Sequence, residues 1–172
     1  RRAKCSVMLL INPSVERHPC EHIVVNGFDS PQTKDTIEVA FIVAKAFGTP
    51  KITLVEEISR SKVAVSVDDD RSLRKVTLRK ERLRRQEQTR VRDVVKKLPA
   101  EIKKDVNWVT QSVFGRRGYS IGHYARIVRS DLLIMNAQEN SSFFDHFFTR
   151  DLDHILAELP TDVLIVNSKK HE

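Results

Sequence analysis

The residues best suited to chemistry near the start of this chain are His18, Cys20 and His22, which recur at every second position. Imidazole nitrogens and thiolates are the ligands that zinc prefers in structural sites, but such a site takes four ligands. The sequence offers no second cluster to complete it, so we expect a loop that leads into a strand. No arrangement of Ser, His and Asp, or of Cys and His, has a recognisable catalytic context. The sequence therefore predicts neither a metal site nor an enzyme.

A basic segment is the second feature with chemical consequences. The 172 residues carry a formal net charge of +7, and residues 71–97 alone hold twelve Lys/Arg against three Asp/Glu. Clustered Lys and Arg neutralise phosphates, and the predicted basic surface comprises Arg74, Arg82, Arg84 and Arg85. No aromatic residue lies in this segment to stack on bases, which argues against nucleic acid. A solvated helix, an anionic membrane surface and an acidic partner stay open.

The elements that would position these residues follow an α/β pattern, in which short apolar runs alternate with amphipathic segments. The pattern predicts an open five-stranded parallel sheet with helices on both faces. Ligands bind such sheets beyond the carboxyl ends of the strands, where the strand order reverses. The expected strands are residues 22–28, 51–57, 105–113, 131–137 and 161–167, with a short extra strand at 62–67 and helices at 31–47, 71–98, 119–128 and 149–159.

Local signals predict where two of these helices begin and what they bury. Ser30 followed by Pro31 is typical of a helix start, with Ser as N-cap. The run of aspartates at 68–70 supplies caps for the basic helix, and Glu81–Arg85 and Asp93–Lys97 are predicted ion pairs on it. One apolar stripe is predicted to face the core, formed by Leu73, Val76, Leu83, Val91, Val94, Val95 and Leu98.

Size and cysteine content bound the class of protein. The length suits one domain, which we place at residues 21–172 after a leading strand and linker at 1–20. Two cysteines, Cys5 and Cys20, make no disulfide framework and indicate a reducing compartment, hence the cytoplasm. The apolar runs, such as residues 7–11, are far too short to span a membrane. Because the chain begins with Arg1, we expect it to be part of a longer protein.

Two long segments resemble the universal stress protein domain. The segment RIVRSDLLIMNAQENSSFFDHFFTRDLDHILAELPTDVLIVN is similar to its closing half, in which a D-L-I-V-M-G strand, a loop, a helix and a C-P-V-L-V-V strand follow one another. The segment HIVVNGFDSPQTKDTIEVAFIVAKAFGTPKITLVEEI is similar to its first strand, acidic turn, helix and second strand. The resemblance covers residues 21–167 and implies the adenine nucleotide alpha hydrolase-like fold.

The resemblance also implies a nucleotide site, which this sequence has altered. Nucleotide-binding members carry G-x-x-G-x9-G-(S/T), in which glycines let backbone N–H groups approach phosphates. Here no glycine remains, and the carboxylate of Glu139 would repel a phosphate. We therefore expect no cofactor; the alternative is ATP or another adenine nucleotide held by a non-glycine loop. The residues of this degenerate site are Asn136, Glu139, Thr149 and Arg150 in the loop, and Asn26, with Asp29 nearby, in place of the family's acid at the first strand's end.

Partners and role are likewise expectations from the resemblance. It implies a homodimer formed through the edge strand Val163, Leu164, Ile165 and Val166. Residues 4–12 (KCSVMLLIN) resemble the closing strand of a preceding copy, which implies tandem copies or a strand that fills this edge. We expect a non-catalytic, cytosolic regulatory or sensory domain, part of a transporter such as a cation/proton antiporter or an amino-acid transporter. The alternatives are an adenine-nucleotide-binding stress protein and a module that binds nucleic acid or an anionic surface through residues 71–97.

Overall fold

The protein is described by a computed structural model that covers residues 5–11, 13, 15–16, 18–63, 69–115, 119–136, 159 and 161–168. Its strands form one six-stranded sheet in the order β1-β6-β5-β2-β3-β4. Five of them run parallel, as the sequence predicts, while β1 pairs antiparallel with β6. The strands are β1 (Val7–Leu9), β2 (His22–Asn26), β3 (Lys51–Ser59), β4 (Asn107–Gly115), β5 (Leu132–Asn136) and β6 (Asp162–Val166).

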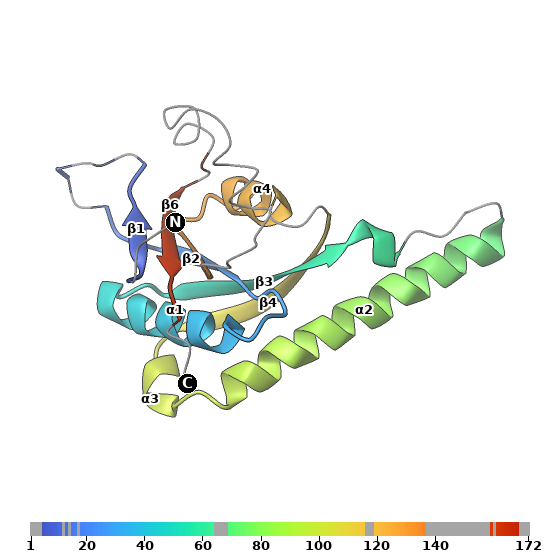
Figure 1. Cartoon of the computed structure of the whole chain (residues 1–172), viewed down its shortest axis with the longest axis horizontal. Coiled ribbons are helices and arrows are strands. Elements are labelled where there is room, and N and C mark those ends of the chain that lie inside the picture. The colour runs from blue at the N-terminus through green and yellow to red at the C-terminus, as the bar shows by residue number, and fades with distance from the viewer. Residues whose placement is uncertain are drawn as a thin grey trace.

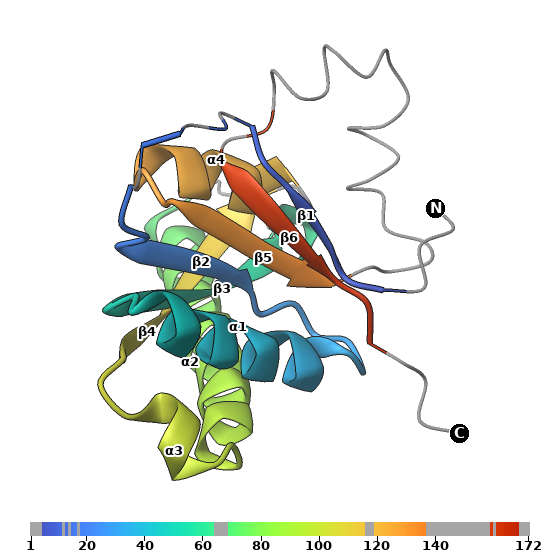
Figure 2. The same ribbon diagram turned by 90° about the vertical axis from the view of Figure 1, so that its left-hand side faces the viewer.

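Helices cover both faces of the sheet, which confirms the expected α/β class (Figure 2). The apolar cluster on one face joins Ile23, Leu54 and Ile134 to Phe41 of α1 and Val91 of α2. On the other face, α4 packs over its own apolar cluster. None of the helices in the described part is both long and apolar enough to cross a membrane. The helices are α1 (Thr33–Phe47), α2 (Asp70–Lys96), α3 (Ala100–Lys103) and α4 (Tyr119–Ile127).

Strand β1 covers the edge that the sequence assigns to a dimer. Val7 pairs with Ile165 and Leu9 with Val163. The contact continues beyond the strand, because the N–H of Ile11 donates to Oδ1 of Asp162 at 2.9 Å. The predicted dimer edge, Val163 to Val166, therefore lies between β5 and β1 and is not a free edge in this chain. An edge covered from within no longer offers its main-chain groups to a second copy.

Helix α2 is docked only through its C-terminal part. Val91 and Val95 are buried, but Leu73 is 53% exposed, so the prediction that the whole apolar stripe packs in the core is wrong. The helix is 27 residues long, about 40 Å, and its N-terminal half extends past the sheet (Figure 1). The predicted aspartate cap is confirmed, since Asp69 accepts the N–H of Ser72 at 2.7 Å and the Ser72 hydroxyl accepts the N–H of Asp69.

One local prediction is wrong, and another falls largely outside the described residues. Ser30 is not the cap of α1, because the helix starts at Thr33 with Gln32 as N-cap. The polar atoms of Ser30 bond instead to the side chain of Thr33, which holds residues 28–33 in a turn before the helix. The extra strand predicted at 62–67 lies largely outside the described residues, which omit residues 64–68; of its described part, Lys62 belongs to the 3-10 turn Arg60–Lys62.

Candidate functional site

The candidate site lies where the strand order reverses, between β2 and β5. The chain moves from β2 outward to β3 and β4, then returns to place β5 on the other side of β2. The carboxyl ends of β2 and β5 flank the point where open α/β sheets bind their ligands. Asn26 ends β2 and Asn136 ends β5. Two of the predicted site residues therefore stand at the point that sequence and topology both indicate.

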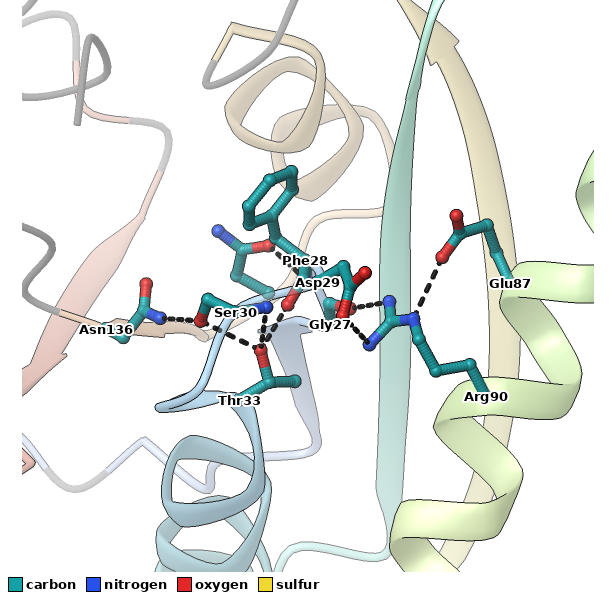
Figure 3. Close-up of polar contacts among 9 residues, drawn as sticks. Gly27, Phe28, Asp29, Ser30, Thr33, Glu87, Arg90 and Asn136 are labelled. Atoms are coloured by element: carbon teal, nitrogen blue, oxygen red, sulfur yellow. Dashed lines mark hydrogen bonds and ion pairs between the residues drawn. The ribbon is translucent and has the colours of Figure 1, made fainter. Parts of the chain in front are cut away.

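The turn after β2 bonds to itself and to β5 (Figure 3). Oδ1 of Asn26 accepts the N–H of Phe28 at 3.0 Å, and the Thr33 hydroxyl donates to the Phe28 carbonyl. Oγ1 of Thr33 accepts the N–H of Ser30 at 3.1 Å. Across the switch point, Nδ2 of Asn136 donates to Oγ of Ser30 at 2.8 Å. The side chains that could face a ligand here are thus joined into one internal network.

Arg90 of α2 bonds to the other side of the turn after β2. Its Nη2 donates to the Gly27 carbonyl at 2.6 Å, and its Nε donates to Oε2 of Glu87 at 2.9 Å. Its Nη1 lies 3.7 Å from Oδ1 of Asp29, whose side chain is 74% exposed. Hydrogen bonds between charged groups and carbonyls are among the stronger polar contacts in proteins. The predicted residue Asp29 therefore lies beside a guanidinium that the sequence analysis did not assign to the site.

Gly27 lets α2 come this close. A Cβ on Gly27 would lie 3.2 Å from the Val55 carbonyl oxygen and 3.3 Å from Cγ2 of Val91. The N–H of Gly27 also donates to that carbonyl at 2.8 Å, which prolongs the ladder between β2 and β3. A side chain here would push α2 away from the turn, and the contact of Arg90 with the Gly27 carbonyl would lengthen.

A buried carboxyl lies behind this network, on β3. Glu56 is 1% exposed; its Oε2 accepts the Ser112 hydroxyl at 3.0 Å, and its Oε1 has no hydrogen-bond partner among the described residues. Burial raises the pKa of Glu56 from 4.5 to about 7, although the Ser112 hydroxyl and the charge of Arg90 oppose the rise. The charge of Glu87 adds to the rise. Glu56 thus titrates near neutral pH, which the alternating apolar pattern of β3 gave no reason to expect.

The rest of the predicted loop site, Glu139, Thr149 and Arg150, lies outside the described residues. Of the six predicted ligand-loop residues, the structure therefore places Asn26, Asp29 and Asn136. Asn26 and Asn136 bond to the same turn, and Asp29 belongs to it. The sequence analysis missed Ser30, Thr33 and Arg90. The Ser30 and Thr33 hydroxyls could have been found as turn-forming side chains, whereas nothing in the sequence places Arg90 beside Gly27.

His18, Cys20 and His22 do not form a metal site. Nε2 of His22 shares a 2.8 Å hydrogen bond with Oγ1 of Thr53 in the protein interior, while His18 is exposed. Burial, together with the charge of Lys51, lowers the pKa of His22. Within the described ranges, no three His, Cys, Asp or Glu side chains are grouped as metal ligands. The expectation of a loop leading into a strand is confirmed, since residues 18–20 precede β2.

The predicted basic surface lies on α2. Arg74, Arg82 and Arg85 are exposed, whereas Arg84 is half-buried and its Nη1 lies 3.0 Å from Oε1 of Glu81. The ion pairs predicted at four-residue spacing form at three-residue spacing instead, Glu81 with Arg84 and Asp93 with Lys96. Both spacings bring side chains together on a helix, so periodicity alone does not choose between them.

Sequence comparison finds no relative of this chain: no protein-family model matches it, and no curated protein matches it. Solved structures do resemble it. UspA, the universal stress protein from Lactobacillus plantarum, matches with a TM-score of 0.56 at 15% identity, over 87% of this chain and 99% of that one. A universal stress protein solved in complex with cAMP matches with a TM-score of 0.53 at 16% identity, over 88% of this chain and 100% of that one.

A third structure is longer than this chain. A universal stress protein from Archaeoglobus fulgidus DSM 4304 matches with a TM-score of 0.57 at 13% identity, over 99% of this chain but only 52% of that one. At such low identity the matches establish architecture, and the element order and sheet topology agree with it. The chain has the fold of the universal stress proteins.

Proposed function

We propose that this chain is a non-catalytic regulatory domain in which the ligand site of the universal stress protein fold is closed by the protein's own side chains. One observation carries the proposal. The turn after β2 is bonded on one side to Asn136 of β5 and on the other side to Arg90 of α2. A ligand at this point would have to displace hydrogen bonds that the protein already makes, and each displaced bond costs affinity.

The residues at the site support a binding or regulatory role over catalysis. Among the described residues, the groups nearest the switch point are two amides, two hydroxyls, one exposed carboxylate and one guanidinium. None of these contacts pairs a nucleophile with a general base, which covalent catalysis would need. Glu56 has a pKa suited to proton transfer, but it is 1% exposed and lies below the turn.

Titration calorimetry with ATP and with cAMP tests the closed site. We expect no saturable heat at millimolar nucleotide for the wild-type chain, because Asn136 and Arg90 already hold the turn. A matched titration of the Asn136→Ala variant checks whether freeing Ser30 opens the site. Micromolar binding to the wild-type chain would overturn the proposal.

Adenine-nucleotide binding is the second candidate, and two observations favour it. One structure with this fold was solved with cAMP. In this chain the Asp29 carboxylate is 74% exposed beside the switch point, and carboxylates near the strand ends of nucleotide-binding α/β folds accept hydrogen bonds from ribose hydroxyls. If the second candidate is right, Asp29→Asn weakens nucleotide binding about ten-fold or more, whereas Glu101→Gln, a change at an exposed acid on α3, leaves it unchanged.

The proposal extends to assembly. Strand β1 occupies the β6 edge where the predicted dimer partner would pair. We therefore expect that the whole chain does not dimerise through this edge. This arrangement supports the view that residues 4–12 stand where the closing strand of a second copy would lie. Membership of a membrane transporter and a cytosolic location stay predictions, and the full-length gene sequence tests the first.

Removing residues 1–13 should convert the chain from monomer to dimer, because the freed β6 edge exposes main-chain donors and acceptors that a second β6 can pair with. Light scattering of the two forms at equal concentration measures the change as a doubling of mass. An unchanged monomer mass for the shortened form would refute competition between β1 and a second copy.

A further inference from the structure

The outward face of α2 is basic along its N-terminal half. At about 100° per residue, one arc about 140° wide collects Arg71, Arg74, Lys75, Arg79, Arg82 and Arg85 over about 21 Å of helix. All six side chains are exposed. Glu81, an acidic residue in the same stretch, lies just outside the arc and pairs with Arg84. The six charges on this face therefore stay unneutralised by acids of the helix.

The docking of α2 fixes the direction of this basic face. Val91 and Val95 are buried against the sheet, and their helical positions lie opposite the arc. The basic face therefore points away from the domain. Figure 1 shows α2 as a straight rod along the outer side of the molecule, with its N-terminal half past the sheet.

One apolar side chain sits in the middle of the basic face. Leu78 is 70% exposed, and Arg74, Lys75 and Arg82 lie one turn from it on the helix. Against nucleic-acid phosphates, an isolated leucine among arginines has no partner. At a bilayer surface it can insert between headgroups while the flanking cations bind the phosphates. Residues 71–97 also contain no aromatic side chain for stacking on bases.

We propose that the face formed by Arg71, Arg74, Lys75, Leu78, Arg79, Arg82 and Arg85 binds an anionic lipid surface. This function goes beyond the regulatory role and is independent of whether the site at the switch point holds a ligand. The positive charge is concentrated in this segment, because the chain outside residues 71–97 carries a slight excess of acids. The domain would then lie with α2 against the membrane and the switch point accessible from solution.

Co-sedimentation of the whole chain with vesicles tests the proposal. The chain should bind vesicles that are roughly one-third phosphatidylserine at about 0.1 M salt, and should not bind pure phosphatidylcholine. Binding should be lost at about 1 M salt, where the Debye length falls to about 3 Å. Binding that is equal on both lipids, or that persists in high salt, would overturn the proposal.

Variants distinguish binding through this face of α2 from binding that depends only on the net charge of the chain. Each basic residue near an anionic surface contributes about five-fold in partitioning, so the triple change of Arg79, Arg82 and Arg85 to Gln should weaken binding roughly a hundred-fold. The same three residues changed to Lys should retain most of it, because the charge is kept. The matched control changes Lys34, Lys62 and Lys104, exposed residues off α2, to Gln and should stay within a few-fold of the wild type.

A last pair of measurements identifies the class of partner. Leu78→Ala should weaken vesicle binding about five-fold while leaving its salt dependence unchanged, because only apolar insertion is lost. Binding of duplex DNA or RNA that is tighter than vesicle binding at the same salt, and unaffected by Leu78→Ala, would assign the face to nucleic acid and overturn the proposal. Circular dichroism of each variant confirms that α2 is intact.

Discussion

Replacing Glu56 with Gln should raise the free energy of unfolding at pH values above 7 by about 3 kcal/mol. Burial raises the pKa of this carboxyl from 4.5 to about 7. The folded chain therefore binds the Glu56 proton more tightly than the unfolded chain does. The stabilisation that this proton contributes to the folded chain is complete below about pH 4.5. It falls as the pH rises to about 7 and stays constant above that pH. Gln at this position has no titrating proton, so the variant lacks the decrease in the free energy of unfolding between these pH values.

Urea unfolding at several pH values between about 5 and 8 measures the effect. The wild-type and Glu56→Gln curves should nearly meet at the acidic end and diverge toward the basic end. The control is Glu101→Gln, which changes an exposed acid on α3 and should run parallel to the wild type. Parallel curves for Glu56→Gln as well would show that Glu56 titrates at its ordinary pKa.

Replacing Arg90 with Met should lower the free energy of unfolding by about 2–3 kcal/mol. The change keeps most of the aliphatic length but removes the donors to the Gly27 carbonyl and to Glu87. The side chain of Glu87 is only 17% exposed, so its carboxylate would be left largely without water or partner. Loss of the nearby positive charge should also raise the pKa of Glu56 further, since Arg90 lowers it in the wild type.

Arg92→Met is the matched control, because Arg92 lies on the same helix but is exposed. Its effect should stay within about 0.5 kcal/mol. Urea unfolding compares the two variants, and hydrogen exchange of the amides in the turn after β2 reports whether that turn loosens in Arg90→Met alone. Equal losses from both variants, with unchanged exchange in the turn, would mean that Arg90 contributes only as a surface charge.

The central strands could be predicted from the sequence because β2 and β5 are buried on both faces and so read as continuous apolar runs. His22–Asn26 and Leu132–Asn136 have this character, and their observed bounds lie inside the predicted ones. The placement of Asn26 at the end of the first strand and of Asn136 in the ligand loop came from the resemblance. The order of the strands in the sheet is contained in neither the apolar periodicity nor the local turn signals.

What the sequence could not supply depends on contacts between distant residues. Arg90 and Gly27 are 63 residues apart, and no local pattern links them. The exposure of Leu73 follows from where the sheet ends beneath α2, whereas the stripe that contains Leu73 has the same periodicity as a buried one. Ser30 has the chemistry of an N-cap, yet its hydroxyl bonds to the Thr33 hydroxyl and to Nδ2 of Asn136.

The pairing of β1 with β6 sets the order in which the protein can be completed during synthesis. The two strands are separated by more than 150 residues, and β1 leaves the ribosome first. At a synthesis rate of about 5–20 residues per second, β6 is made on the order of ten to thirty seconds after β1. Strands β2 and β3, which pair across a single helix, can form long before that. The pairing of β1 with β6 is therefore a late step, which cannot occur until β6 has been made.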